Sequence, residues 1–479
     1  MITFVLGLII LVVGGAIYGR FCEKLIAPTD NSTPAERLRN DIDFVPMSKK
    51  KNALIELLNI AGTGPVLGPI QGILFGPIAF LTIPIGCVIG GAFHDYMSGM
   101  ISVRNDGDQM PSLMRRYLGK IIYNIYHIFV CLLLLLVGAV FIYTPGDLFV
   151  LQVLGGNTET LNSEILTVYI AIFVYYFLAT LLPIDKIIGR IYPVFGAILL
   201  LSAVGIFFGL FFKDYPLKEI WDTGFSGVNP MGENFIPIFF VTVACGIVSG
   251  FHSTQATLIS RTLSSEKEGR FVFYNSMIAE GFIAMAWAAA AMGTVDLNLT
   301  DIGMLHEKPV AVVGIIAKDM LGSIGGSIAV LGVIVLAITS GDTALRSLRV
   351  ILGDALKIDQ ANKVKAGVLA GVIFAIVAAM LFFAKTDSSG FRVLWRYFSW
   401  ANETIAVFAF AMITVYMMRN NLPYIMALIP GSFYMYVVCS YILNATIGFG
   451  LSWNMAYVIA GILTVLFVFA LLKYGKKRN

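Results

Sequence analysis

Charged residues are scarce in this sequence. Only 13% of its 479 residues are Asp, Glu, Lys or Arg, whereas 58% are hydrophobic, and the mean hydropathy is +0.84. A soluble domain of this length could not cover so much apolar surface with so few charges, so the composition predicts an integral membrane protein. The apolar stretches run for about 18 to 28 residues, the length of membrane helices and more than that of barrel strands. We therefore expect an all-α polytopic membrane fold.

The sequence also lacks the motifs of several enzyme and metal-binding classes. Its five cysteines form no C-x-x-C pair, and its four histidines form no H-E-x-x-H motif. Neither a nucleophile elbow nor a G-x-x-x-x-G-K-[ST] phosphate loop occurs. The longest polar segments, 21–52 and 295–325, are too short to build a soluble domain. We expect no enzymatic activity, no cofactor, no metal site, no nucleic-acid partner and no ATP-driven transport by this chain alone.

Apolar runs separated by charged residues, glycine and proline predict thirteen membrane spans. The first begins without basic residues and has no small-residue cleavage site, so it reads as a span and not as a signal peptide. The predicted spans are 2–20, 53–75, 77–101, 121–143, 165–183, 190–212, 235–260, 271–294, 327–350, 365–384, 394–418, 423–444 and 453–473.

The basic residues predict how these spans are oriented. When the loops are assigned alternately to the two sides, 26 of the 33 lysines and arginines fall on one side. Cytoplasmic loops carry the excess of positive charge, so the N-terminus is predicted outside and the C-terminus inside. The loop 144–164, which has no lysine or arginine, is then external.

The second span contains helix breakers in the stretch AGTGPVLGPIQGILFGP. Small residues at a spacing of four let a neighbouring helix approach closely, and this packing role is our interpretation of Gly72 and Gly76. Pro65 and Pro69 need another explanation, because each removes an amide donor and clashes with the preceding turn. Freed carbonyls are costly in hydrocarbon unless they face protein, water or a ligand, so we predict an unwound segment at a binding site over residues 61–69.

A second interruption is predicted in the seventh span, FFVTVACGIVSGFHSTQATLISRTL. Glycines and hydrogen-bonding side chains crowd its middle around His252, at a polar density too high for lipid. A lone histidine is more often a packing residue, but these neighbours favour a functional role. Because the two broken spans lie five apart, they run in opposite directions, as in an inverted repeat of five spans plus five with broken helices at the midplane.

Ionisable residues deep in a membrane are functional candidates, because a charge at the bilayer centre costs about 2.5 to 3.5 kcal/mol. Such residues occur in the third, eighth, ninth and eleventh spans. Glu56 receives little weight, since it lies near the start of its span and can reach water. The candidates are His94, Asp95, Glu280, Asp342 and Glu403.

Asp342 stands among hydroxyl side chains in the stretch AITSGDTALRSLR. A carboxylate with neighbouring hydroxyls suits a sodium ion or a protonatable site. The alternative is a structural hydrogen-bond cluster in which Arg346, one turn later, is the partner of Asp342. Both readings stay open at this point.

The adjacent residues His94 and Asp95 should point about 100° apart on a helix, so we expect them not to form a pair on one face. One of them would then face the transport pathway. A pairing of Asp95 with Arg104 near the inner surface is the alternative. For Glu280 and Glu403 the sequence does not distinguish proton transfer from hydrogen bonding.

Taken together, the stretches NIAGTGPVLGPI, GAFHDYMSGMISVRNDG, ACGIVSGFHS, SGDTALRSLRVILGD and WANE resemble the carbon starvation protein A family of bacterial inner-membrane transporters. The order and spacing match across nearly the whole chain. Two local departures are LIELLN, where related chains often have a histidine pair, and WANE in place of ANQ. The resemblance implies a leucine-transporter-like fold of inverted five-span repeats and the uptake of peptides or pyruvate.

The resemblance and the spans together suggest a domain organisation. Residues 1–52 form a first transmembrane helix and a cytoplasmic loop, 53–212 the first five-helix repeat, 235–418 the second, and 419–479 two accessory helices. We expect a multi-pass protein of the bacterial inner membrane whose partners are the lipid bilayer and a small-molecule substrate, a peptide, pyruvate or an amino acid. Its oligomeric state is left open.

The resulting functional hypothesis is a secondary symporter driven by a proton or a sodium ion. A channel or a nutrient sensor is the alternative, and a membrane-embedded enzyme is less favoured. The predicted substrate-binding residues are Ala61, Gly62, Thr63, Gly64, Pro65, Ser249, Gly250, His252 and Ser253. The predicted ion-coupling residues are Asp342, Thr339, Ser340, Thr343, Asp95 and His94.

Overall fold

The computed structural model describes residues 1–40, 44–181, 185–213, 215–225, 227, 229–295, 299–358 and 362–476, and within these ranges every regular element is helical. The first ten α-helices are α1 (Ile2–Ile9), α2 (Gly15–Ile26), α3 (Pro34–Arg37), α4 (Lys49–Ile60), α5 (Gly64–Gly72), α6 (Ala79–Gly86), α7 (Ala92–Val103), α8 (Met110–Phe149), α9 (Ser163–Leu181) and α10 (Asp185–Phe212). The next ten are α11 (Ile220–Thr223), α12 (Phe240–Ile247), α13 (Gly250–Ile259), α14 (Asn275–Thr294), α15 (Leu299–Glu307), α16 (Pro309–Ala355), α17 (Lys363–Thr386), α18 (Gly390–Arg419), α19 (Ile425–Asn444) and α20 (Trp453–Gly475).

Short π-helical segments adjoin several of these helices. They are η1 (Ile10–Gly14) between α1 and α2, η3 (Cys87–Gly91) between α6 and α7, η4 (Val150–Leu154) after α8, η5 (Phe235–Phe239) before α12 and η7 (Arg270–Tyr274) before α14. Two 3-10 turns, η2 (Ile73–Phe75) and η6 (Glu266–Glu268), complete the described elements.

Within the described residues, ten helical stretches are long and apolar enough to cross a membrane; some join successive elements, as Ile2–Ile26 joins α1, η1 and α2. The bent pair formed by α4 and α5 with η2 passes the same test as one span. Every one of the thirteen predicted ranges overlaps a helix. In the described residues, the fifth and sixth ranges hold the shorter apolar helices Ser163–Ala179 and Gly196–Phe212. The structure therefore supports a polytopic helical membrane protein, and the count of thirteen stays a prediction.

Two long helices contain a kink at a glycine with positive φ. Gly119 in α8 has φ 85°, and Gly322 in α16 has φ 72°, a conformation that residues with a Cβ rarely adopt. The predicted spans 121–143 and 327–350 begin just after these kinks. The apolar runs therefore located the parts of both helices after the kinks, while the helical segments before the kinks were missed.

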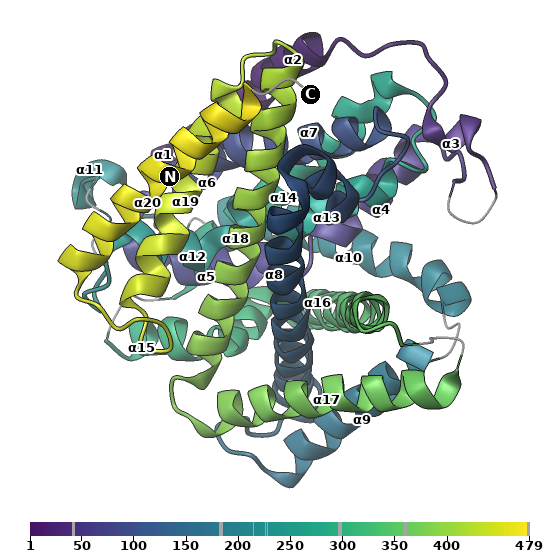
Figure 1. Cartoon of the computed structure of the whole chain (residues 1–479). Coiled ribbons are helices and arrows are strands. Elements are labelled where there is room, and N and C mark those ends of the chain that lie inside the picture. Colours follow the sequence, from purple (N-terminus) through teal and green to yellow (C-terminus); the bar gives the residue numbers. More distant parts are fainter. Residues whose placement is uncertain are drawn as a thin grey trace.

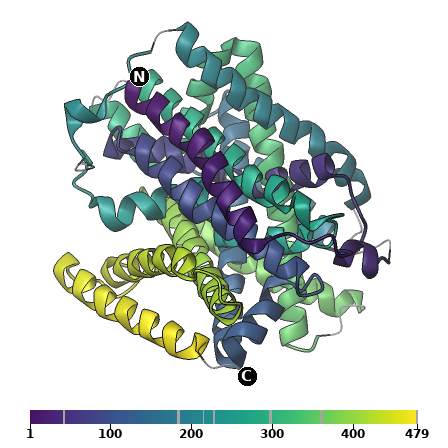
Figure 2. The same ribbon diagram turned by 90° about the horizontal axis from the view of Figure 1, so that it is seen from above.

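The broken helices lie inside the bundle, and the last helices lie at its edge. The short helices α5 and α12 pack against each other near the centre, surrounded by α14, α16 and α18 (Figure 1). The helix α20 lies at the outer edge of the bundle (Figure 2). It exposes apolar side chains such as Val458, Val465 and Phe469. Such an apolar outer face suits lipid contact.

The tight centre follows from small side chains. Six of the eight residues of α14 from Ala284 to Ala291 are alanine, and all six are buried. Small residues let neighbouring backbones approach closely in a membrane bundle. The helices α5 and α10 pack against α14 accordingly.

Candidate functional site

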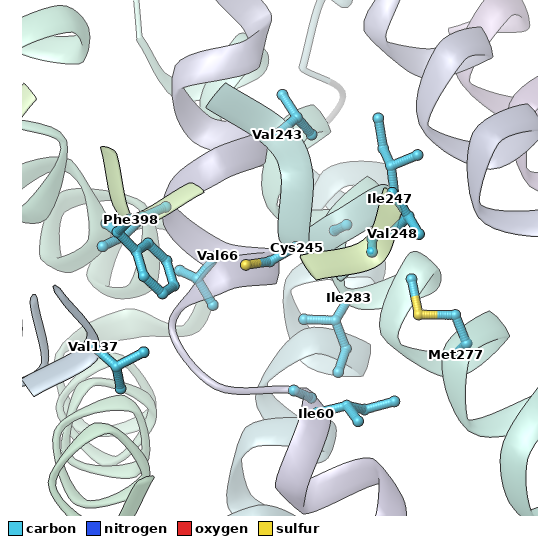
Figure 3. Packing of buried hydrophobic residues seen from close by; sticks show 14 of the residues in the cluster. Ile60, Val66, Val137, Val243, Cys245, Ile247, Val248, Met277, Ile283 and Phe398 are labelled. Atoms are coloured by element: carbon cyan, nitrogen blue, oxygen red, sulfur yellow. The ribbon is translucent and has the colours of Figure 1, made fainter. Parts of the chain in front are cut away.

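The first break separates α4 from α5 at Ala61–Thr63. The two helices are bent by 52° there, and Ala61 leaves the helical region with ψ 62°. Figure 3 shows the chain leaving the helix after Ile60 as a loop and entering the next helix near Val66. The break lies at the predicted place but is shorter than predicted, because residues 64–69 are helical. Pro65 stands in the first turn of α5, where its missing amide hydrogen is not needed, and Pro69 is tolerated inside the helix.

The second break lies at Val248 and Ser249, between α12 and α13. Both residues are extended, with φ −155° and −140°. Asn402 of α18 bridges this break: its Oδ1 accepts hydrogen bonds from the amide of Phe251 (2.9 Å) and the hydroxyl of Ser249 (3.1 Å). Asn402 thereby caps the N-terminus of α13 from a different helix.

The two breaks lie against each other. A Cβ on Gly64 would come within 2.3 Å of Cβ of Cys245, and a Cβ on Gly68 within 2.8 Å of the carbonyl oxygen of Thr242. Val66 and Cys245 appear as neighbours in Figure 3. These glycines therefore allow the close approach of α5 to α12. The structure thus brings all nine predicted substrate-binding residues to two adjacent breaks.

The packing role predicted for the next two glycines holds for one of them. A Cβ on Gly72 would lie 2.6 Å from Cγ2 of Val243, so Gly72 is a close-packing position. Gly76 has φ 82°, and the nearest atom to a Cβ there would be 3.8 Å away. The prediction for Gly76 was wrong: this glycine serves the turn before α6 and not helix packing.

A chain of buried charged groups lies beside the second break. Oδ1 of Asp95 is 2.8 Å from Nδ1 of His94, and Oδ2 of Asp95 is 3.1 Å from Nδ1 of His252. Nε2 of His252 lies 3.5 Å from Oε2 of Glu280. All four side chains are at most 2% exposed. The helices α7, α13 and α14 thus place two imidazoles and two carboxyl groups in one series of successive contacts.

The expectation that His94 and Asp95 could not pair was wrong. Their Cβ atoms point in different directions, but the His94 side chain turns along the helix surface, so that Nδ1 of its imidazole reaches the carboxylate of Asp95. The alternative pairing of Asp95 with Arg104 was also wrong, because Arg104 pairs with Glu266 at 3.1 Å. Both candidates therefore face the interior and act as one group.

Two further carboxyl groups are completely buried. Glu56 in α4 and Glu403 in α18 are 0% exposed, and no carboxylate oxygen of either accepts a hydrogen bond from the described residues. The low weight given to Glu56 was a mistake, since α13 and α14 pack over α4 and seal it from water. A single acid in the apolar stretch LIELLN, just before the breakers, was the available signal.

Asp342 has its ion-pair partner on its own helix, α16. Nη2 of Arg346 lies 3.5 Å from Oδ1 of Asp342 and also donates to the carbonyl oxygen of Ala179 at 2.7 Å. This geometry matches the structural alternative raised from the sequence. The hydroxyls of Thr339 and Thr343 bond to carbonyls of the same helix.

The two remaining predicted residues are the serines Ser253 and Ser340. Ser253 donates to the carbonyl oxygen of Gly250 at 2.6 Å and so stiffens the first turn of α13. Ser340 is buried on α16, next to Thr339. Within the described residues, no group of three or more His, Cys, Asp or Glu has a metal-binding arrangement.

A polytopic helical bundle with two adjacent broken helices and buried charges beside them defines a membrane transport protein. Solved structures support the fold. A manganese transporter of Eremococcus coleocola aligns with a TM-score of 0.56 over 89% of this chain and 92% of its own, at 9% identity. At that identity the likeness concerns the fold alone.

The chain belongs to the carbon starvation protein CstA family, which it matches over residues 1–150, 147–298 and 310–441. An uncharacterized membrane protein of Haemophilus influenzae is 39% identical over 337 residues, which cover 61% of this chain and 91% of that protein. The peptide transporter CstA of Helicobacter pylori is 25% identical over 333 residues, or 57% of this chain and 48% of that protein. The pyruvate/proton symporter BtsT of Escherichia coli is 24% identical over 317 residues, or 54% of this chain and 44% of that protein.

The matched region thus spans about half the length of the curated peptide and pyruvate transporters. The relatives named for an activity are transporters and not enzymes, in agreement with the sequence-based expectation. The resemblance inferred from the motifs is confirmed at the level of the family.

Proposed function

We propose that this protein is a secondary active transporter that takes up small peptides, or small carboxylates such as pyruvate, during nutrient starvation. The names of the relatives supply these two substrate classes. The main support for this proposal is that two helix breaks meet beside a series of buried charged groups. Such a site can bind a polar solute and an ion together. The driving ion is a proton or a sodium ion.

The N-terminus of α5 is the better position for a substrate carboxylate. Helix N-termini attract anions through free amides and the helix dipole. At α13 the amide of Phe251 already donates to Asn402. At α5 the hydroxyl of Thr63, which is 0% exposed, has no hydrogen-bond partner among the described residues. A carboxylate at this break would satisfy that hydroxyl.

The topology of the proposed transporter follows the sequence prediction. Thirteen spans place the N-terminus outside and the C-terminus in the cytoplasm of a bacterial inner-membrane protein. Spans two to six and seven to eleven form two inverted repeats, and their broken helices carry the site. Rocking of one group of helices against the other then opens the site to each side in turn.

Uptake into proteoliposomes tests this function. Labelled pyruvate and a labelled dipeptide are offered under an inward proton gradient, an inward sodium gradient or neither. We expect saturable accumulation of one of these substrates with one of the gradients. A non-saturable current without accumulation would favour a channel, and the absence of transport for both substrates would overturn the proposal.

A pair of variants links uptake to the first break. Thr63→Val removes only the hydroxyl and is expected to weaken substrate binding, which raises KM. Thr386→Val is the matched control, because the hydroxyl of Thr386 is exposed and bonds to the carbonyl oxygen of its own helix at Phe382. Equal KM values for both variants and the parent would remove Thr63 from the site.

A further inference from the structure

Three carboxyl groups and two imidazoles are buried together beside the second break. They come from α4, α7, α13 and α14, and none is more than 2% exposed: Glu56, His94, Asp95, His252 and Glu280. We propose that this cluster is the proton-binding site that couples transport, with Glu56 as the carboxyl group that holds the exchangeable proton. The inference rests on the proposed function and differs from the sequence prediction, which placed coupling mainly at Asp342.

The charge balance of the cluster requires a bound proton. If both imidazoles were protonated, three ionised carboxylates would still leave one negative charge without a partner. An uncompensated charge in a buried site is strongly unfavourable, and such groups take up a proton instead. At least one of the three carboxyl groups is therefore neutral in this arrangement.

The contacts single out Glu56 as the neutral group. Asp95 faces an imidazole nitrogen with each of its two oxygens, which favours its ionised form. Glu280 has no hydrogen bond among the described residues, but Nε2 of His252 lies 3.5 Å from its Oε2 as an ion-pair partner. Glu56 faces no such cation within the described residues, and the charges acting on it are those of Asp95 and Glu280, both of its own sign.

The composition of the cluster favours a proton over a sodium ion. Hard cations are held by several oxygen ligands arranged around one point. Here two of the five groups are imidazoles, and Asp95 turns both of its oxygens towards them. A proton needs only one oxygen and leaves these contacts in place.

The surroundings of the cluster contribute other titratable groups. The thiol of Cys87 donates to the carbonyl oxygen of Met277 at 3.3 Å. On α12 Cys245 interacts with Glu280, and on α19 Tyr434 interacts with Cys87; Glu403 of α18 acts on both Cys245 and Tyr434. None of them adds a positive charge, so they do not relieve the excess negative charge.

The position of Glu56 connects the proton to the substrate. It lies on α4, five residues before the first break at Ala61, and α4 packs against both α13 and α14. With Glu56 protonated, α4 can stay packed beside Asp95 and Glu280. When the proton leaves to water, repulsion between like charges drives α4 away and changes the shape of the break.

Glu56→Gln tests the proposal, because glutamine keeps the size and mimics the neutral acid. In proteoliposomes we expect this variant to exchange labelled for unlabelled substrate, while the accumulation driven by a proton gradient is lost and the inner concentration only equals the outer. The matched control is Glu164→Gln, the same change at an exposed carboxyl group of α9 outside the cluster, and it should keep the accumulation. Accumulation by Glu56→Gln at the level of the parent protein would overturn the proposal.

A second measurement decides the site without any substrate. In infrared spectra of the purified protein at neutral pH, the absorption of buried protonated carboxyl groups should be smaller in Glu56→Gln than in the parent protein and in Glu56→Asp. The part that remains comes from Glu403, which is likewise buried without a hydrogen-bond partner among the described residues. An unchanged spectrum in Glu56→Gln would overturn the assignment. If the parent protein takes up neither pyruvate nor the dipeptide, the proposed function fails, while the spectra still decide the proton site.

Discussion

The two helix breaks are built by different means. At the first, the chain itself supplies the interruption, with Gly62 and Gly64 around it and Pro65 at the start of the next helix. At the second there is no proline, and Asn402 from α18 holds the extended residues in place. The first break is therefore a local property of its sequence, whereas the second depends on a tertiary contact.

The second broken helix is also tied to α18 at its other end. Glu233, just before η5, pairs with Arg396 of α18 and accepts from Nε2 of His306 in α15 at 3.1 Å. Nε of Arg392 lies 3.7 Å from Glu307 in the same network. Since α12 and α13 are both fastened to α18, these three helices should move together, and α4 with α5 should be the partner that moves against them.

The largest loss of stability is expected from Gly64→Ala, which introduces a steric clash between the two breaks. The new Cβ would lie 2.3 Å from Cβ of Cys245. Overpacking of this kind costs about 1–3 kcal/mol, and we expect the upper end because the position of Cβ of Cys245 is fixed by its backbone and cannot shift by a rotamer change. Thermal unfolding in detergent measures the loss.

The double variant Gly64→Ala with Cys245→Gly controls this prediction. It removes the atoms that the new Cβ would meet and should restore part of the lost stability. If the single variant is as stable as the parent, α5 and α12 do not pack as closely as described, and the two breaks are less strongly coupled than this comparison requires.

Asn402→Ala should cost somewhat less, about 2 kcal/mol. It leaves the buried amide of Phe251 without an acceptor and removes a helix cap. Asn402→Asp keeps the acceptor oxygen and should retain most of the stability. Hydrogen exchange of the first turn of α13 provides the local measurement. Unchanged protection in Asn402→Ala would show that the second break, like the first, does not depend on a contact from another helix.

The tie at Glu233 should weaken in acid. Burial alone raises the pKa of Glu233, but the hydrogen bond with His306 and the pairing with Arg396 outweigh it and bring the pKa to about 2. The folded pKa is below the usual value of about 4.3, so the stabilisation is present above about pH 4.3 and is lost as the pH falls towards 2. Melting temperatures of the parent should therefore drop more steeply over this interval than those of Glu233→Gln; parallel curves would exclude the pairing.

The smallest effect on stability is expected from Thr63→Val at the first break. The change removes a buried hydroxyl that has no partner among the described residues, so the variant should be equally stable or gain less than about 1 kcal/mol. Thermal unfolding without substrate measures this. A clear loss of stability would mean that Thr63 supports the break structurally, as Asn402 does at the second.

The sequence predicted most of the fold because membrane helices are encoded locally. Apolar length identified a helix in every predicted range, and glycine with proline located the first break. The extent of that break was overestimated, because Pro65 and Pro69 fit inside α5. Asn402 was missed as a site residue because a cap supplied by another helix leaves no periodic signal.

The buried charges were harder to predict, because burial depends on which helices pack together. Glu56 lies near the start of its span and is sealed only by α13 and α14. The contact between His94 and Asp95 follows from the bending of two side chains, which a helical projection ignores. Asp342 stood out in the sequence, yet Arg346 on the same helix already compensates its charge.

The seal around Asp95 and His252 has a consequence for energy conservation in the cell. Any continuous hydrated path for protons across a membrane dissipates a proton gradient. A series of titratable groups open to water on both sides would be such a path. Here every link of the chain is enclosed by helices, with at most 2% of any side chain exposed. In the conformation described, the cluster therefore offers protons no continuous hydrated path.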